Sequence, residues 1–126
     1  MQIKQRHNWN LTTSEAKTIQ EELAVLSFPD LQLQEQTIAK RPTSFPYIPG
    51  FLSFREIPAV LDALEKINIT PDIILCDGQG LAHPRRLGIA CHLGVILDMP
   101  TIGVAKSWLI GDYEEVPQQK ESWKPL

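Results

Sequence analysis

The sequence between residues 72 and 78 reads Asp72-Ile73-Ile74-Leu75-Cys76-Asp77-Gly78, an apolar run that an Asp-Gly pair ends. Such a run predicts a β-strand over 72–76 that is covered on both faces. Residues 87–97 follow with small and apolar residues at helical spacing, and after Pro100 residues 101–104 predict a second buried strand. A strand, a helix and a strand in this order form a βαβ unit with parallel strands, so the sequence predicts an α/β fold.

Upstream of this unit lies a helix preceded by a stiff connection. Three prolines make residues 41–50 non-helical. Ser53-Phe54-Arg55-Glu56 has the capping-box pattern, in which side chains satisfy the free N–H groups at a helix start. Apolar residues then recur at helical spacing, so a helix is expected over 54–67.

The N-terminal part predicts a helix followed by a hairpin. Thr12-Thr13-Ser14-Glu15 is another capping-box pattern, which predicts a helix over 13–23. Residues 24–28 are apolar, Pro29-Asp30 predicts a turn, and residues 31–37 alternate, which together indicate a β-hairpin with a short first arm. No connecting residues lie between the helix and the hairpin, although such connections usually have about 2 to 6.

Composition and length indicate one ordinary globular domain of 126 residues, with 43% hydrophobic and 21% charged residues. Within this single domain, 1–126, we interpret residues 1–11 as a leader, 12–110 as the core and 111–126 as a loose acidic tail. No apolar run approaches the ~18 residues of a membrane span, and the N-terminus lacks the apolar region of a signal peptide. The chain is therefore expected to be cytoplasmic, with both cysteines reduced and buried.

The net charge of −3 argues against a broad basic surface. Residues 40–106 hold 7 Lys and Arg against 6 Asp and Glu, a balance of +1, whereas the flanks hold the other 5 and 9, a balance of −4. The middle of the chain is therefore the part that favours an anionic partner, and this difference is weak evidence by itself.

Two acidic residues lie where a ligand could bind. Asp77 follows a strand at the end where α/β sheets bind ligands, and its alternative role is to form a turn with Gly78. Glu56 opens a helix, where it either completes the capping box or joins Asp77 in a hard-cation site. Mg²⁺ prefers oxygen ligands and takes one or two carboxylates together with phosphate and water.

Basic and small residues surround these carboxylates in the sequence. Lys106 directly follows a strand, level with Asp77 if the strands are parallel, and is either solvated or placed to stabilise a reacting phosphate. His83-Pro84-Arg85-Arg86 opens a helix as a phosphate-binding segment or as a solvated basic turn. Gly78-Gln79-Gly80 allows a ligand to approach the backbone, but a bare G-x-G is a weak signal.

Pro46-Tyr47-Ile48-Pro49 holds an aromatic and an aliphatic side chain between two prolines. Rigid, exposed apolar side chains act as wedges between bases in some DNA-binding proteins. The alternative is that Tyr47 and Ile48 pack in the core.

Four blocks of the sequence, taken together, strongly resemble the endonuclease V family. They are residues 46–56, 76–80, 83–88 and 101–106, in the order that the family has them. The resemblance covers roughly residues 12–117 and implies a ribonuclease H-like fold, with a mixed sheet flanked by helices. It further implies a deoxyinosine-specific DNA repair nuclease that cuts the second phosphodiester bond on the 3′ side of a deaminated base.

The same resemblance implies roles for individual residues. Glu56 and Asp77 would bind Mg²⁺, which Mn²⁺ can replace, and together with Lys106 near the scissile phosphate they would form the catalytic set. The strand-separating wedge would consist of Pro46, Tyr47, Ile48 and Pro49. The pocket for the flipped base would take parts from Gly50, Leu52, Gly78, Gly80, His83 and Leu109. Apart from the resemblance, the guanidinium groups of Arg85 and Arg86 are expected to contribute affinity for DNA phosphates.

The chain departs from the family pattern in two places. The family's first strand, which ends in an aspartate of the metal site, is missing after Leu23. The later helix with a catalytic histidine is also missing. We therefore expect an incomplete domain, as an internal deletion and a C-terminal truncation would leave, with impaired cleavage.

The expected partner is DNA with deaminated bases, with RNA left open, and the protein is expected to be a monomer that does not bind membranes. Two alternatives remain open. The chain is either a catalytically inactive fragment that binds inosine in nucleic acid, or a small α/β domain that binds a phosphate metabolite between Asp77 and Lys106.

Overall fold

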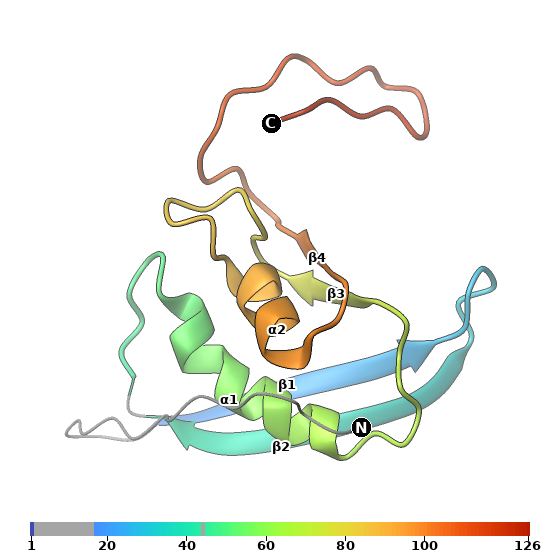
Figure 1. The fold of residues 1–126 in the computed structure, drawn as a ribbon, viewed down its shortest axis with the longest axis vertical. Helices are drawn as coiled ribbons and strands as arrows, with labels where there is room; N and C mark the ends of the chain where they lie inside the picture. The colour runs from blue at the N-terminus through green and yellow to red at the C-terminus, as the bar shows by residue number, and fades with distance from the viewer. Residues whose placement is uncertain (2–16, 44) are drawn as a thin grey trace.

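The computed structural model describes residues 1, 17–43 and 45–126. A hairpin of two strands is followed by helices that alternate with strands, which confirms the predicted α/β class (Figure 1). The elements in chain order are β1 (Lys17–Leu26), β2 (Leu33–Thr43), α1 (Leu52–Glu65), β3 (Ile74–Asp77), α2 (Ile89–Leu97) and β4 (Thr101–Val104).

The βαβ unit forms as predicted, but only one face of its sheet is covered. β3 and β4 pair in parallel, with Leu75 opposite Ile102 and Asp77 opposite Val104. These four side chains share one face, where the exposed fractions of Leu75, Ile102 and Val104 are 66%, 49% and 54%. The prediction of strands buried on both faces was therefore wrong, because α2 packs on the opposite face and leaves this one to solvent.

The hairpin is longer than predicted, and its first arm replaces the predicted helix. β1 pairs antiparallel with β2 from Lys17 opposite Thr43 to Leu26 opposite Leu33. The prediction of a helix was therefore wrong for residues 17–23. The predicted start of that helix, with its capping box at residues 12–15, lies outside the described residues. Burial in β1 alternates with period two, so pairing with the long β2 overrides the helical spacing read from the sequence.

The helix α1 begins at Leu52 and is capped by Phe51 without a side-chain hydrogen bond. The predicted capping box at Ser53 was therefore wrong. Ser53 lies within the first turn of α1 and is buried, and its Oγ atom is 3.0 Å from Nδ1 of His92 in α2. A buried hydroxyl needs a hydrogen-bond partner, and this contact across the two helices supplies one.

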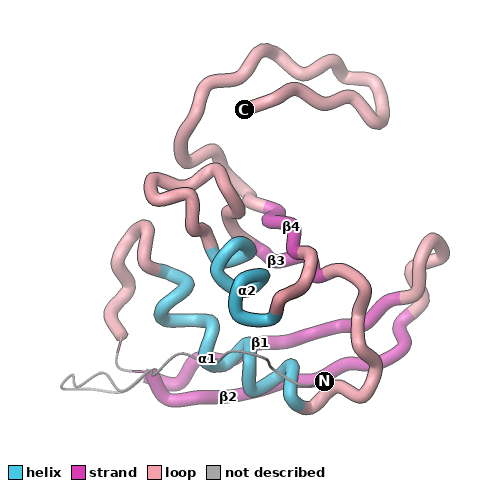
Figure 2. The backbone as a smooth tube through the Cα atoms, viewed as in Figure 1, coloured by secondary structure: helices cyan, strands magenta, loops and turns pink. Residues whose placement is uncertain are grey.

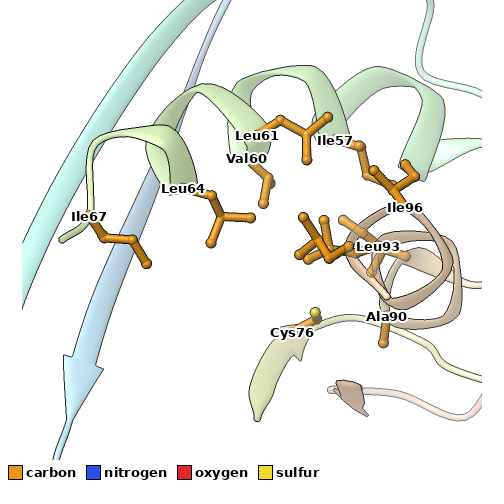
Figure 3. Close-up of a cluster of buried hydrophobic side chains, with 11 residues drawn as sticks. Ile57, Val60, Leu61, Leu64, Ile67, Cys76, Ala90, Leu93 and Ile96 are labelled. Atoms are coloured by element: carbon orange, nitrogen blue, oxygen red, sulfur yellow. The ribbon is translucent and has the colours of Figure 1, made fainter. Parts of the chain in front are cut away.

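The hydrophobic core lies between the two helices and extends to β3. Its largest fully buried side chains are Ile57, Leu61 and Leu64 of α1 and Leu93 and Ile96 of α2. Figure 3 shows these side chains gathered between the helices, with Cys76 of β3 beneath them. Since α1 also packs on β1 and β2, this helix joins the hairpin to the βαβ unit (Figure 1).

The described strands form two separate two-stranded sheets, β1–β2 and β3–β4. α1 packs on β1–β2, α2 packs on β3–β4, and the two helices pack against each other. The two sheets are not joined by strand pairing. Loss of an inner strand, as predicted from the sequence, would leave this arrangement. Residues 105–126 contain neither helix nor strand and extend away from the other elements (Figure 2). Within the described residues, no helix has the length and apolarity needed to cross a membrane.

We expect the isolated chain to unfold with low cooperativity and to aggregate, because the open face of β3–β4 and the strand edges have no partners among residues 17–43 and 45–126. The Leu75→Lys variant places a charge on that face and should reduce light scattering during a thermal melt severalfold. The matched control is Gln20→Lys, which adds the same charge to the exposed side of β1. A sharp melt whose midpoint does not depend on protein concentration would contradict this expectation.

Candidate metal and nucleic-acid-binding site

The carboxyl end of the parallel sheet carries an ion pair. Asp77 is the last residue of β3, and Lys106 lies two residues beyond β4. The Nζ atom of Lys106 donates a hydrogen bond to Asp77 Oδ2 at 2.6 Å, so the two residues are level, as the parallel arrangement predicted. This hydrogen bond and the charge of Asp77 raise the pKa of Lys106. Both side chains are exposed, so this is a surface ion pair that contributes little to the stability of the fold.

Glu56 lies on α1 within electrostatic range of Asp77. Burial raises the pKa of its carboxyl, Arg55 lowers it, and the negative charge of Asp77 raises it further. Arg55 is held in place because its Nη1 donates to the carbonyl of Phe45 at 2.7 Å. The negative charge of Asp77 therefore acts on the carboxylate with which the sequence pairs it.

A third carboxylate, Glu21 in β1, was not predicted. Burial raises its pKa from 4.5 to about 7, and the charges of Glu56 and Asp77 add to the shift. Glu21 was missed because residues 17–23 were assigned to a helix, which separated it from the other two. Ile19, Glu21 and Leu23 alternate with exposed neighbours in the paired strand. The sequence carried no such signal for Glu21, because both of its neighbours are polar as well.

The donor set fits a hard cation only in part. In the described part of the chain, no three His, Cys, Asp or Glu side chains come together as a metal-holding group. Glu56 and Asp77 supply two carboxylates, which suits Mg²⁺ because this ion keeps several of its water ligands. One carboxylate oxygen of Asp77 already accepts a hydrogen bond from Lys106.

A cavity of about 250 Å³ lies beside this ion pair. Eight of the predicted site residues line it, namely Tyr47, Pro49, Gly50, Leu52, Gly78, His83, Lys106 and Leu109. Sequence reasoning missed seven lining residues, Ser53, Gln79, Leu87, Gly88, Ile89, Ala105 and Ser107. These are small, apolar or neutral, so their residue types gave no chemical signal, and only the packing of the motifs brings them to the cavity.

Other predicted site residues lie outside the cavity. Gly80 was expected to line it and does not. The backbone of Gly80 lies against Gly103 of β4. A Cβ atom added to Gly103 would lie only 2.5 Å from the amide nitrogen of Gly80. Residues 78–80 therefore lie directly on the backbone of β4, and Gln79 Nε2 fastens them further by donating to the carbonyl of Ser107 at 2.8 Å.

The wedge segment lies at the edge of the cavity. Tyr47 lines the cavity and is 70% exposed, so core packing was the wrong alternative for this side chain. Ile48 is 41% exposed, and neither Ile48 nor Pro46 lines the cavity. The structure thus presents an aromatic side chain to solvent beside a pocket, as the wedge hypothesis requires.

His83 forms one wall of the cavity and is buried. Its Nε2 lies 3.0 Å from the carbonyl oxygen of Gly50, and its Nδ1 accepts from the backbone N–H of Arg85 at 3.2 Å. Because the carbonyl oxygen only accepts and the backbone N–H only donates, this pattern assigns the proton to Nε2. His83 therefore links two loops through its two ring nitrogens. Arg85 and Arg86 are exposed and lie outside the cavity lining.

The sequence model of the endonuclease V family matches residues 10–126. The chain belongs to this family. It is 60% identical to endonuclease V of Trichormus variabilis over 161 aligned positions that include all of this chain and 73% of the relative. It is 74% identical to the Nostoc punctiforme enzyme over 82% of this chain and 47% of the relative. The family is one of metal-dependent nucleases with a ribonuclease H-like fold, which confirms the predicted fold class.

Solved endonuclease V structures agree with this assignment. The Streptomyces avermitilis protein superposes with a TM-score of 0.82 at 43% identity, covering 91% of this chain and 50% of that one. The Ciona intestinalis protein, solved with a 24mer DNA containing an inosine followed by a ribo-adenosine, gives 0.67 at 38% identity, covering 79% and 42%.

Part of the relatives has no counterpart in this chain. The Trichormus alignment has 161 positions and this chain has 126 residues, so at least 161 − 126 = 35 positions are unmatched. The chain spans about half the length of several curated relatives, including those from Nostoc punctiforme and Rippkaea orientalis. Both facts agree with the expectation of an incomplete domain.

We expect Glu21→Gln to stabilise the protein above pH 7 in metal-free buffer. The folded-state pKa of Glu21, about 7, exceeds the ordinary value of 4.5, so its ionisation costs stability as pH rises through that interval. The variant should remove this decline and raise the free energy of unfolding by about 1 kcal/mol at pH 8, a value that allows for solvent screening. At pH 4 it should have little effect. Urea unfolding at several pH values measures it. Glu22→Gln, on the exposed face of β1, is the control, and equal effects of both variants would contradict the assignment.

Proposed function

We propose that this chain binds nucleic acid containing deaminated bases and accepts the inosine base in the cavity beside Asp77. The observation that carries the proposal is that one cavity of about 250 Å³ is lined by residues from all the separate sequence motifs. This volume is below the ~300 Å³ at which pockets for drug-sized ligands begin, and it suits a group of the size of a single base. The inosine-containing DNA bound by the Ciona relative supports the same substrate class.

A flipped base leaves its stack and is held by backbone groups and stacking in a fitted pocket. The exposed ring of Tyr47 lies at the cavity edge, where it would fill the gap in the stack. Other backbone groups beside Gly50 and Gly78 would read the edge of the base. The Gly50 carbonyl already accepts from His83 and Arg85, and the Gly78 N–H already donates to the carbonyl of Val104. His83 would hold one wall of the pocket through Gly50.

Glu56 and Asp77 would hold the metal, which we propose to be Mg²⁺ with Mn²⁺ as a substitute. When bound, such a metal activates water and neutralises charge on a phosphate. Lys106 would contact the phosphate next to the flipped nucleotide, where its positive charge would offset the negative charge of the nucleic-acid backbone. In the free protein it is hydrogen-bonded to Asp77, so metal or phosphate must compete with this ion pair.

We propose that binding is retained and that cleavage is impaired. Binding depends on the cavity and the wedge, both of which this chain has. Cleavage in this family is expected to need a further aspartate and a histidine, on segments that the sequence predicts to be missing. The structure brings no third carboxylate close enough to complete a metal group within the described residues.

The first test compares an inosine-containing duplex with an undamaged one. We expect Tyr47→Ala to reduce the ratio of the two affinities about tenfold, because a wedge acts only where the stack opens, while total affinity changes less. Gel-shift titration and a nicking assay with Mg²⁺ on the same preparation should show binding without cleavage. Equal losses on both duplexes would contradict the wedge role, and stronger binding of a free nucleotide would favour the phosphate-metabolite alternative.

The second test concerns the metal. We expect weak Mn²⁺ binding that Asp77→Asn abolishes and Lys106→Met strengthens severalfold, because the methionine keeps the length of the side chain and frees the carboxylate of Asp77. Calorimetric titration measures both variants. Lys124→Met is the control, since Lys124 pairs with Glu114 in the tail. Tight binding that survives Asp77→Asn would place the metal elsewhere.

A further inference from the structure

We propose that Arg85 is a positioning residue, which fixes the turn at Pro49–Gly50 and thereby the wedge and one wall of the cavity. The effect on lesion recognition rests on the proposed function, whereas the effect on the turn does not. The sequence predicted that both Arg85 and Arg86 contact phosphate. In this proposal Arg85 holds the turn, and Arg86 is the arginine that contacts phosphate.

The turn itself has a definite geometry. The N–H of Phe51 donates to the carbonyl of Ile48 at 2.9 Å, with Pro49 and Gly50 between them. Gly50 has φ of +80°, which is the value that a type II turn requires at its third residue and that favours glycine. The Pro-Gly pair therefore reverses the chain directly after the wedge side chain of Tyr47.

Two donors from the loop 83–86 converge on this turn. The carbonyl oxygen of Gly50 faces His83 Nε2 at 3.0 Å and also accepts a hydrogen bond from Arg85 Nη2. The backbone N–H of Arg85 donates to His83 Nδ1, which fixes the histidine with its proton on the Gly50 side. Arg85 thus acts on the turn twice, once through its side chain and once through the orientation of His83.

The guanidinium of Arg85 also packs on the first of three rings that contact one another in sequence from the surface to the core. Its central carbon lies 3.8 Å from the centroid of the Phe51 ring. Phe51 is 6.0 Å from Phe54, and Phe54 is 5.1 Å from the buried His92 of α2. Cation–π and aromatic contacts of this kind favour one arrangement of the rings. The turn is therefore fastened to the packed helices on one side and to the loop 83–86 on the other.

A planar guanidinium is suited to this task because it can donate along its edge to Gly50 while its face lies on Phe51. A lysine ammonium has the same charge but no planar face, so it cannot meet both demands with one geometry. Since Gly50 and His83 line the cavity and Tyr47 stands at its edge, a displaced turn would change the pocket and the wedge together.

The experiment compares the full chain with Arg85→Ala, Arg85→Lys and Arg86→Ala. The first measurement needs no DNA and follows amide hydrogen exchange of Phe51, with Leu61 in the core as the internal reference. We expect both Arg85 variants to speed exchange at Phe51 about fivefold to tenfold, as loss of one hydrogen bond would, with Leu61 unchanged. Arg86→Ala should leave Phe51 as it is.

The second measurement follows affinity for inosine-containing and undamaged duplexes at several salt concentrations. Arg85→Ala and Arg85→Lys should lower the ratio of the two affinities and keep the salt slope, whereas Arg86→Ala should lower both affinities and reduce the slope by about 1. Unchanged exchange at Phe51 in Arg85→Ala, or full rescue by lysine, would overturn the proposal. An unmodified chain that does not discriminate between the duplexes would refute the proposed function instead, and exchange at Phe51 would still decide the role of Arg85.

Discussion

The apolar contact between α1 and α2 is the interaction on which the rest of the structure depends. The described strands form two sheets with no pairing between β1 and β3, so the helices must hold the two halves together. Ile57, Leu61 and Leu64 meet Leu93 and Ile96 in this contact (Figure 3), and burial of each such side chain contributes about 1.5 to 3 kcal/mol. A packed helix pair therefore replaces the strand ladder that normally runs across an α/β domain.

The candidate site lies across this same junction. Glu56 and the wedge belong to the half that contains the hairpin and α1, whereas Asp77, Lys106 and His83 belong to the βαβ half. The relative position of the carboxylates is thus set by helix packing. Their mutual repulsion opposes that packing, and the ion pair of Lys106 with Asp77 offsets part of it. Stability and the charges of the candidate site are therefore coupled at this junction.

Recognition and cleavage make different demands on such a chain. A base-sized cavity needs shape, exposed backbone groups and a wedge, and these come from short motifs that the chain holds in full. Phosphodiester hydrolysis needs several charges placed with high precision around one phosphate. The alignment with the Trichormus variabilis relative has at least 35 positions that this chain lacks. The proposal of retained binding with impaired cleavage rests on this difference between the two demands.

Sequence alone determined the βαβ unit, the hairpin and α1, because local spacing and turn residues fix these elements. The resemblance to the family, and not local spacing, pointed to the eight site residues that line the cavity. It assigned residues 17–23 to a helix, since their apolar spacing suits both structures and only pairing with β2 decides for a strand. It also missed Glu21 and placed Gly80 in the pocket. Which side chains meet across α1 and α2, and which face of β3–β4 stays open, was decided by tertiary structure. Those outcomes depend on packing between segments distant in sequence, which no local pattern encodes.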